Sequence, residues 1–353
     1  MRIAFLAPIK PPDHPIASGD RLIARNLVAA LERGGEDVVL ASRFIAYSKR
    51  RQGLAERRSA ALVKAEAAVA RLQSAPPDLV LAYHPYCKAP DWIGPRIAAA
   101  FGAPYVTVEA ARASVDWPDW RAEAQSQMAK ADLHVWLKPT DRDMLAAALG
   151  PDAPLAHLAP FIDIAAIDAI EGRAAPGARV LVVGQMRPGK KAANHALAAA
   201  ALSRLDRRVD TLVLGDGPER AAITPLYPPG TRFAGAVSHE AVVREMRAAD
   251  LFLWPGDREP IGMVYLEAAA SALPVVATAD MGVPLVVADG ETGLLSPPRD
   301  AAALAANLAA LLEDGARRAA LGQAGRARVV SQHSLDSAAS TLQSLLSRFR
   351  PSR

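Results

Sequence analysis

Residues 251–278 read LFLWPGDREPIGMVYLEAAASALPVVAT, and this stretch decides the fold. It opens with a short apolar run, 251–255, and closes with a second, 275–278. The alanine-rich segment between them has helical character from near Gly262 to Ala270. Continuous apolar strands with a helix between them are typical of a parallel sheet covered on both faces. The stretch therefore predicts a strand, a helix and a second, parallel strand.

The same alternation extends outward through the whole chain. It restarts near residue 178, after the segment 164–178, which we interpret as a linker because of Gly172, Pro176 and Gly177. We therefore expect an α/β protein with two Rossmann-like doubly wound parallel-sheet domains facing across a cleft. The expected domains are 1–165 and 178–335, with a C-terminal helix in 336–353 that packs back on the first domain. The expected strands are Ile3–Ala7, Val38–Ser42, Leu79–His84, Tyr105–Glu109, His134–Leu137, Leu155–Ala159, Val180–Gly184, Thr211–Gly215, Arg232–Gly235, Leu251–Pro255, Val275–Thr278 and Gly293–Ser296.

Composition fits a globular two-domain chain of 353 residues, with 51% apolar and 22% charged residues. The net charge of +4 does not require a nucleic-acid partner. A single cysteine, Cys87, excludes an intrachain disulfide and a cysteine-rich metal site, which fits a cytoplasmic protein. The opening residues do not resemble a signal peptide, and no apolar run reaches the roughly 18–20 residues of a membrane span.

The segment 43–71 is basic, with eight lysines and arginines against Glu56 and Glu66. Two interpretations stay open at this point. The segment is either a solvated helix face or a surface for phosphate or an anionic membrane. Membrane contact of this chain would then be peripheral, at the inner face of the membrane.

Two glutamates frame the start of the helix in the opening stretch. Glu259 precedes the helix and Glu267 lies in its second turn, with Gly262 between them. The first N–H groups of that helix, on Gly262, Met263 and Val264, are available to an anion and are aided by the helix dipole. Glycine lets a phosphate approach the backbone closely, and carboxylates accept hydrogen bonds from sugar hydroxyls. The block predicts a site for a diphosphate with a sugar at each end.

This block resembles the E-x7-E signature of the retaining glycosyltransferases of family 4, which have the GT-B fold, and the following LEAAASALPVVAT is also family-like. The resemblance implies that Glu259 contacts the donor sugar and Glu267 the nucleotide ribose. It places the amides of Gly262–Val264 on the diphosphate. It implies a metal-independent hexosyl transfer, with a nucleoside-diphosphate sugar as co-substrate and no further cofactor.

The segment 185–191, QMRPGKK, matches a second family element only in part. The family has Gly-Arg-Leu, three residues and then Lys-Gly, and its arginine and lysine neutralise the leaving diphosphate. Lys190 aligns with that lysine, whereas Gln185 stands at the arginine position. Arg187 is a candidate replacement for the missing charge, and a solvated basic turn is the alternative interpretation.

Two further segments extend the resemblance. GDGP at 215–218 and FAGAVS at 233–238 match the turn after the family's second strand and its base-contacting loop, which assigns Gly215, Gly235 and Val237 to donor binding together with Gln185. The segment MGVPLVV keeps Gly282 but lacks the glutamate that the family commonly has there. The resemblance is close over about residues 178–330 and loose in the first half.

The first half should then hold the acceptor, for which a lipid or a cell-envelope polysaccharide is the family's example. Gly19 stands before a helix and fits the family's glycine loop, while Asp20 is interpreted either as a plain N-cap or as a functional residue. His84 and Glu109 each end an expected strand and so point to the ligand edge of the sheet. The family often has histidine where Glu109 stands.

Two other signals are interpreted as structural. Asp141 and Asp143 have the spacing of a metal-binding DxD motif, but they suit the first turn of a helix better. The histidines show no paired metal-ligand spacing and stay unassigned; they are His157, His195, His239 and His333.

Three other functions remain as alternatives. A nucleotide-sugar epimerase or hydrolase would use the same fold without an acceptor, and the two glutamates argue against it. A cofactor-binding oxidoreductase would need a G-x-G-x-x-G turn, which neither domain has. A non-catalytic partner subunit is left open by Gln185 and by the missing acid near Gly282.

Overall fold

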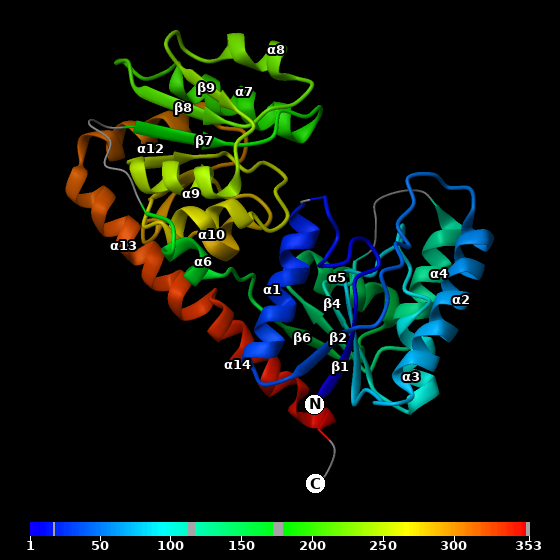
Figure 1. Cartoon of the computed structure of the whole chain (residues 1–353). Helices are drawn as coiled ribbons and strands as arrows, with labels where there is room; N and C mark the ends of the chain where they lie inside the picture. Colours follow the sequence, from blue (N-terminus) through cyan, green and yellow to red (C-terminus); the bar gives the residue numbers. More distant parts are fainter. Residues whose placement is uncertain (17, 112–116, 172–178, 351–353) are drawn as a thin grey trace. The chain divides into compact units, whose positions relative to one another are not determined.

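The computed structural model describes residues 1–16, 18–111, 117–171 and 179–350 and divides into two compact units (Figure 1). The first unit consists of Met1–Ala159 together with the chain from Leu335 onward, and the second of Pro160–Ser334. Each unit contains one six-stranded parallel sheet with helices between its strands. The predicted fold class, two Rossmann-like α/β domains, is confirmed.

The sheet of the first unit has the strand order β2-β1-β3-β4-β5-β6, and all its neighbouring strands are parallel. Its strands are β1 (Arg2–Leu6), β2 (Asp37–Leu40), β3 (Leu79–Tyr83), β4 (Tyr105–Val108), β5 (Leu133–Trp136) and β6 (Leu155–His157). Its helices are α1 (Gly19–Arg33), α2 (Leu54–Leu72), α3 (Gly94–Phe101), α4 (Pro118–Met128), α5 (Pro139–Leu149) and α14 (Leu335–Leu346), followed by the 3-10 turn η2 (Ser347–Phe349).

The sheet of the second unit has the order β12-β11-β10-β7-β8-β9 and is likewise parallel. Its strands are β7 (Arg179–Val183), β8 (Asp210–Leu214), β9 (Arg232–Gly235), β10 (Leu251–Leu253), β11 (Val275–Thr278) and β12 (Gly293–Ser296). Its helices are α6 (Ile164–Asp168), α7 (Lys190–Leu202), α8 (Arg220–Ile223) with η1 (Thr224–Leu226), α9 (His239–Ala248), α10 (Met263–Ala270), α11 (Val283–Val286), α12 (Ala301–Glu313) and α13 (Gly315–Gln332).

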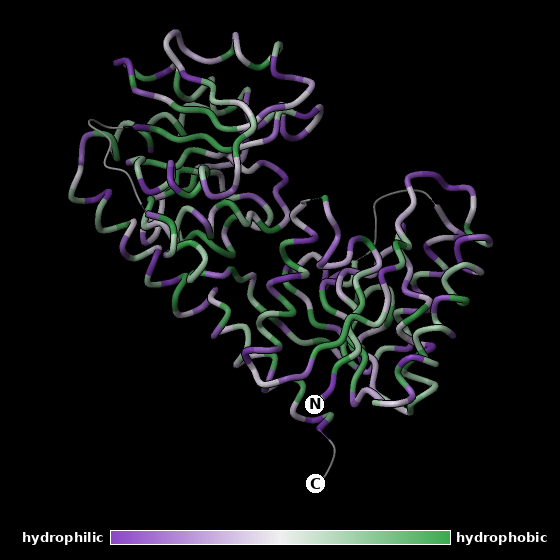
Figure 2. Tube along the Cα trace, in the orientation of Figure 1, coloured by the Kyte–Doolittle hydropathy of each residue, from purple (hydrophilic) through white to green (hydrophobic). Residues whose placement is uncertain are grey.

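Every expected strand is present, and no boundary differs by more than two residues. Strand β3 ends at Tyr83 and β4 at Val108, so His84 and Glu109 are the first residues beyond their strands. Strand β10 ends at Leu253, before Pro255, which has no N–H to continue the ladder. Apolar residues follow the strands through the interior of both sheets in Figure 2, as expected for sheets covered on two faces.

The C-terminal helix α14 belongs to the first unit, where it lies beside α1 (Figure 1). Arg33 at the end of α1 forms an ion pair with Asp336 in the first turn of α14. Arg350 pairs with Glu36, and Glu36 also accepts a hydrogen bond from the N-terminal amine at 2.5 Å. These contacts tie the two ends of the chain to one edge of the first unit.

The linker predicted over 164–178 is wrong at its beginning. Residues Ile164–Asp168 form helix α6, because the Asp163 carboxylate caps it by accepting from the Ala166 N–H at 3.2 Å and Ile167 is buried. Residues 172–178, with the glycines and proline on which the linker prediction rested, lie outside the described residues.

Most of the basic residues of 43–71 contact acceptors of their own unit. Arg43 pairs with Asp13, and Arg58 lies 3.5 Å from Glu123. Arg57 and Arg71 donate to backbone carbonyls. These contacts account for much of the basic segment without an anionic surface. In the part of the chain that the structure describes, no helix is both long and apolar enough to cross a bilayer.

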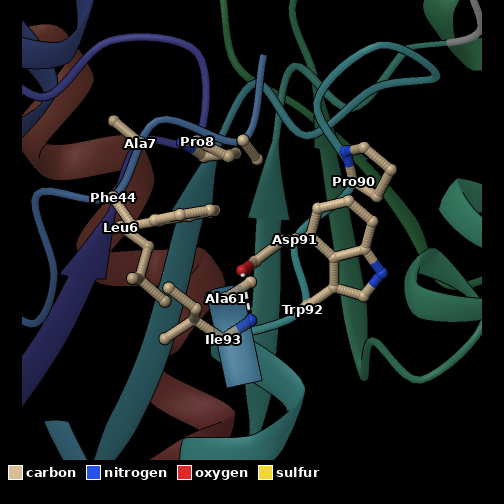
Figure 3. Close-up of a pocket in the computed structure, with 10 residues that line it drawn as sticks. Leu6, Ala7, Pro8, Phe44, Ala61, Pro90, Asp91, Trp92 and Ile93 are labelled. Carbon is tan, nitrogen blue, oxygen red and sulfur yellow. Dashed lines mark hydrogen bonds between the residues drawn. The ribbon is translucent and has the colours of Figure 1, made fainter. Parts of the chain in front are cut away.

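A small apolar cavity lies beside β1 in the first unit, between Leu6, Phe44 and Trp92 (Figure 3). Its volume is about 10 Å³, room for a single water at most. The Asp91 carboxylate at its edge is saturated, because it accepts from the N–H groups of Ile93 and Gly94 and from the Tyr105 hydroxyl. The cavity is a packing gap beside the start of α3, and it is too small for a sugar or a nucleotide.

Candidate functional site

A pocket of about 520 Å³ opens at the carboxyl ends of β7, β8 and β9 in the second unit. This is the edge at which doubly wound sheets bind their ligands. Three of the predicted donor-binding residues, Gln185, Gly215 and Val237, line it together with Arg187, which was predicted to neutralise the leaving diphosphate. Gly235 lies just behind them, since its carbonyl accepts from the Gly215 N–H at 2.8 Å.

The backbone of the β7–α7 loop is locked to the turn after β8. The Met186 N–H donates to the Asp216 carbonyl at 2.9 Å, and the Met186 carbonyl accepts from Glu219 at 3.0 Å. The Met186 side chain is buried, whereas Gln185 and Arg187 on either side of it are exposed. The loop therefore presents one amide and one guanidinium to the pocket from a fixed backbone.

Helix α10 begins at Met263, and its N-cap is Gly262, whose φ of 73° lies in the left-handed region. A Cβ there would lie 2.4 Å from the ring of Tyr265, so this position requires glycine. The N–H groups of the first turn, including those of Met263 and Val264, have no acceptor within the helix. The helix therefore presents a positive dipole end and free donors at the carboxyl end of β10.

Glu259, the first of the two predicted carboxylates, meets a lysine that the sequence analysis missed. The Lys191 Nζ lies 2.6 Å from Glu259 Oε2 and 5.3 Å from the centre of the Trp254 ring. Lys190, the predicted phosphate ligand, is exposed, and its Nζ lies 3.5 Å from the Arg258 carbonyl. The structure thus places Lys191, and not its neighbour, against the predicted sugar-binding carboxylate.

The rotation of helix α7 explains this placement. Residues three and four apart share one face of a helix, and Asn194 and His195 follow Lys191 at those spacings. Both are fully buried, so the face with Lys191 is the one that packs on the sheet. The sequence alone did not select Lys191 over Lys190, because Asn194 also follows Lys190 by four residues and the burial of Asn194 and His195 is known only from the structure.

Hydrogen bonds from two neighbouring segments fix the backbone of the turn that contains Glu259. Asn194 exchanges hydrogen bonds with the backbone of Asp257, accepting from its N–H at 2.8 Å and donating to its carbonyl at 3.0 Å. Gly282, the residue kept from the family pattern, donates its N–H to the Glu259 carbonyl at 3.0 Å. The turn between β10 and α10 is therefore fixed from both α7 and the loop after β11.

Glu267, the second carboxylate, is also paired with a residue that the sequence analysis left unassigned. Its Oε1 lies 3.0 Å from His239 Nε2, while its side chain is only 10% exposed. This hydrogen bond raises the pKa of His239 above the ordinary value, against the opposite effect of burial. His239 is the first residue of α9 and follows the pocket-lining loop that contains Val237.

In the first unit, His84 and Glu109 lie side by side. They follow Tyr83 and Val108, which are register partners on β3 and β4, and both have left-handed φ values, 55° and 54°. Such values are costly for residues other than glycine and concentrate at functional sites. Asp20 lies opposite, with its Oδ1 3.4 Å from His84 Nδ1. Three of the residues predicted for the acceptor site, Asp20, His84 and Glu109, therefore lie close together.

The interpretation of Asp20 as a plain N-cap is wrong. The cap of α1 is Ser18, whose hydroxyl accepts from the Arg21 N–H at 3.3 Å, and Gly19 begins the helix. Asp20 is one residue further on, where its carboxylate is left to face His84. The hydrogen bond with His84 lowers the pKa of Asp20, against its partial burial.

A buried ion-pair network, also missed from the sequence, lies beneath this cluster. The Lys138 Nζ lies 3.0 Å from Glu109 Oε1 and 2.5 Å from Asp141 Oδ2. The Tyr83 hydroxyl donates to Glu109 Oε2 at 3.0 Å. Burial alone would lower the pKa of Lys138, but the two carboxylates outweigh it and raise that pKa. Burial raises the pKa of Asp141 to about 6.

Asp141 and Asp143 do not act together, which agrees with their interpretation as residues of a helix start. Asp141 is in the first turn of α5 and is fully buried against Lys138, whereas Asp143 is exposed and pairs with Arg142 at 2.8 Å. His195 is a core residue, with its ring nitrogens 2.9 Å from the Tyr227 hydroxyl and 3.2 Å from the Gly184 carbonyl.

Two solved structures share this architecture over nearly the whole chain. A glycosyltransferase from Rickettsia africae aligns with a TM-score of 0.77 and 15% identity, covering 99% of this chain and 98% of that one. Sucrose-phosphate synthase from Thermosynechococcus elongatus aligns with a TM-score of 0.74 and 21% identity, covering 98% of each. Two Rossmann-like units with these neighbours define a protein of the GT-B fold.

The second unit shows the clearest sequence similarity to known proteins. The family model of glycosyl transferases group 1 matches residues 177–314 of this chain. A curated relative is the GDP-mannose-dependent alpha-(1-6)-phosphatidylinositol monomannoside mannosyltransferase of Mycobacterium tuberculosis, 30% identical over 237 residues. The match covers 61% of this chain and 61% of the relative's length.

Removing the lysine of the buried network should destabilise the first unit. Lys138→Met leaves Glu109 and Asp141 buried without their cation, which typically costs about 3–5 kcal/mol. We expect the melting temperature of the first unit to fall by roughly 10 °C in a thermal denaturation experiment. Arg142→Met, which breaks an exposed pair on the same helix, should change it by about 2 °C or less. If the two substitutions lowered the melting temperature by the same small amount, the buried ion-pair network would not contribute to stability as expected.

The hydrogen bond between His239 and Glu267 should be visible in the titration of the histidine. Glu267→Gln removes the charged acceptor, so the pKa of His239 should fall towards or below its ordinary value. The measurement is an NMR titration of the histidine ring protons, with the His239 signal assigned by its loss in His239→Gln. Glu240→Gln, which removes a neighbouring carboxylate paired with Arg244, is the control. An unchanged pKa in Glu267→Gln means that the pair does not exist in solution.

Proposed function

We propose that this chain is a hexosyltransferase that moves a sugar from a nucleoside-diphosphate sugar to an acceptor hydroxyl. The donor binds to the second unit, at the carboxyl ends of β7, β8, β9 and β10. The transfer retains the anomeric configuration and requires no metal ion; retention comes from the resemblance to the family 4 enzymes.

The contact between Lys191 and Glu259 is the observation that carries the proposal. It joins the basic loop after β7 to the acidic turn after β10, which are neighbouring strands of one sheet. A donor diphosphate needs cations, and its sugar needs acceptors for its hydroxyl groups. Both kinds of group meet here, beside a pocket large enough for a nucleoside and at the edge where such sheets bind ligands.

The chemical difficulty of the reaction is the charge that develops on the departing diphosphate. Lys191, Arg187 and the first turn of α10 are the cationic or dipolar groups that would stabilise it. Fixed donors of this kind are commonly worth about 3–4 kcal/mol each in the transition state. Gln185 adds a hydrogen-bond donor but no charge, so the proposed cations are Arg187 in the loop after β7 and Lys191 in the first turn of α7.

GDP-mannose is the first donor to test. The curated relative of Mycobacterium tuberculosis is named as dependent on GDP-mannose and matches 61% of this chain. The name of that relative also gives a phosphatidylinositol mannoside as acceptor, which supports a lipid-linked acceptor for this chain.

The polar cluster of the first unit is the proposed acceptor site. Asp20 and His84 are partly exposed and available for hydrogen bonds, and Glu109 behind them is held by Lys138 and Tyr83. Carboxylates and an imidazole in this arrangement suit the hydroxyl groups of a sugar or polyol. Any contact with a membrane would bring a lipid acceptor to this unit at the inner face of the membrane.

Nucleoside diphosphates should stabilise the protein selectively. We expect one of GDP, UDP, ADP and TDP, with GDP the first candidate, to raise the melting temperature by a few degrees at about a hundred times its dissociation constant. Glu267→Ala should abolish the shift. Lys191→Met should weaken binding about tenfold, since it removes a charged hydrogen bond.

Lys190→Met is the matched control, because it removes the neighbouring charge from an exposed position. It should leave the dissociation constant within about twofold of the wild type. A larger effect at Lys190 than at Lys191 would restore Lys190 as the phosphate ligand. No stabilisation by any of the four nucleotides would contradict the proposed function and favour a non-catalytic GT-B subunit.

A further inference from the structure

We propose that His239 is a positioning residue that makes the site selective for ribonucleotides over 2′-deoxyribonucleotides. The inference rests on the proposed function, in which Glu267 receives the ribose of the donor. In this role, the His239 side chain holds the Glu267 carboxylate in a single orientation before the nucleotide binds.

The hydrogen bond between the two side chains has only one possible direction. Glu267 as a carboxylate has no hydrogen to donate, so His239 Nε2 carries the proton and donates it to Oε1 across 3.0 Å. The donation occupies one lone pair of Oε1 and leaves the remaining acceptor positions of the carboxylate free. Two hydroxyls of a ribose need two such positions, and a tethered carboxylate offers them without losing rotamer freedom on binding.

The position of His239 in the chain links this carboxylate to the nucleotide pocket. The loop after β9 lines the pocket with Ala236 and Val237, Ser238 caps α9 by accepting from the Ala241 N–H, and His239 is the first helical residue. One turn further on, Val242 lines the same pocket. His239 therefore lies between the pocket wall and Glu267, on a backbone that the cap fixes.

The burial of the two partners shows which one is held. Glu267 is 8% exposed on the inner face of α10, whereas the His239 side chain is 53% exposed. A long buried carboxylate without a donor would choose among several rotamers, and the histidine restricts that choice. The substitution of His239 should therefore affect ribose recognition and leave the folded structure intact.

The test compares the binding of GDP and 2′-deoxy-GDP by calorimetry, with UDP and ADP and their 2′-deoxy forms measured in parallel. We expect the wild type to prefer the ribonucleotide by about tenfold to a hundredfold, the contribution of one hydrogen bond to a charged group. In His239→Leu the preference should fall below about threefold with the melting temperature of the free protein unchanged. His239→Gln keeps an N–H donor within reach of Oε1 and should restore most of the preference.

Arg244→Ala is the control on the same helix, because Arg244 is exposed and pairs only with Glu240 among the described residues. It should keep the wild-type preference. Binding with the same preference in wild type and His239→Leu would overturn the role of His239 while leaving the proposed donor site intact. Failure of GDP, UDP, ADP and TDP alike to bind would overturn the proposed function itself, and the inference with it.

Discussion

The packing of the Tyr265 side chain is the interaction on which the geometry of the second unit depends. Its ring is fully buried, its hydroxyl donates to the Trp254 carbonyl at 3.0 Å, and its ring lies edge-on to Phe252 at 5.9 Å. A Cβ at Gly256 would lie 2.1 Å from its hydroxyl, and one at Gly262 would lie 2.4 Å from its ring. Two glycines thus make the space for one tyrosine, and the tyrosine fixes α10 on β10. The positions of Glu259 before the helix and Glu267 within it follow from that packing.

The two units use the same sheet architecture for different electrostatics. In the second unit the ligand edge holds an open pocket, a helix N-terminus and cations, an arrangement suited to an anion. In the first unit the corresponding edge holds Asp20, Glu109 and Asp141 against Lys138 and a histidine whose pKa is raised by Glu109 and Asp20 in spite of burial. That edge is unsuited to a phosphate and suited to hydroxyl groups. The proposed division between a donor unit and an acceptor unit rests on this contrast of charge.

The fold was predictable because its signal is strong and local. Twelve short apolar runs separated by helical segments define two parallel sheets, and each run forms a strand within two residues of its expected bounds. The short helix α6 was missed because the glycines and proline near it were given more weight than Asp163, which caps it. The spacing of Glu259, Gly262 and Glu267 predicted the start of α10 because a helix N-terminus next to a strand end depends on neighbouring residues only.

The partners of the site residues were not predictable in the same way. Lys191, His239 and Lys138 contact residues that are 68, 28 and 29 positions away in the chain. Such contacts depend on which strands are neighbours and on the rotation of each helix, which a motif does not record. Helical phase alone does not select Lys191, since only the structure shows that Asn194 and His195 lie on the buried face of α7. Nothing in the sequence distinguishes His239 from the other unassigned histidines.

The central claim is that a nucleoside diphosphate binds to the second unit, between the loop after β9 and the start of α10. Hydrogen–deuterium exchange with and without the stabilising nucleotide tests it most directly. The account predicts slower exchange in peptides covering 235–243 and 257–267, and unchanged exchange in those covering 79–91 and 105–111. Protection confined to the first unit, or spread equally over both sheets, would contradict it.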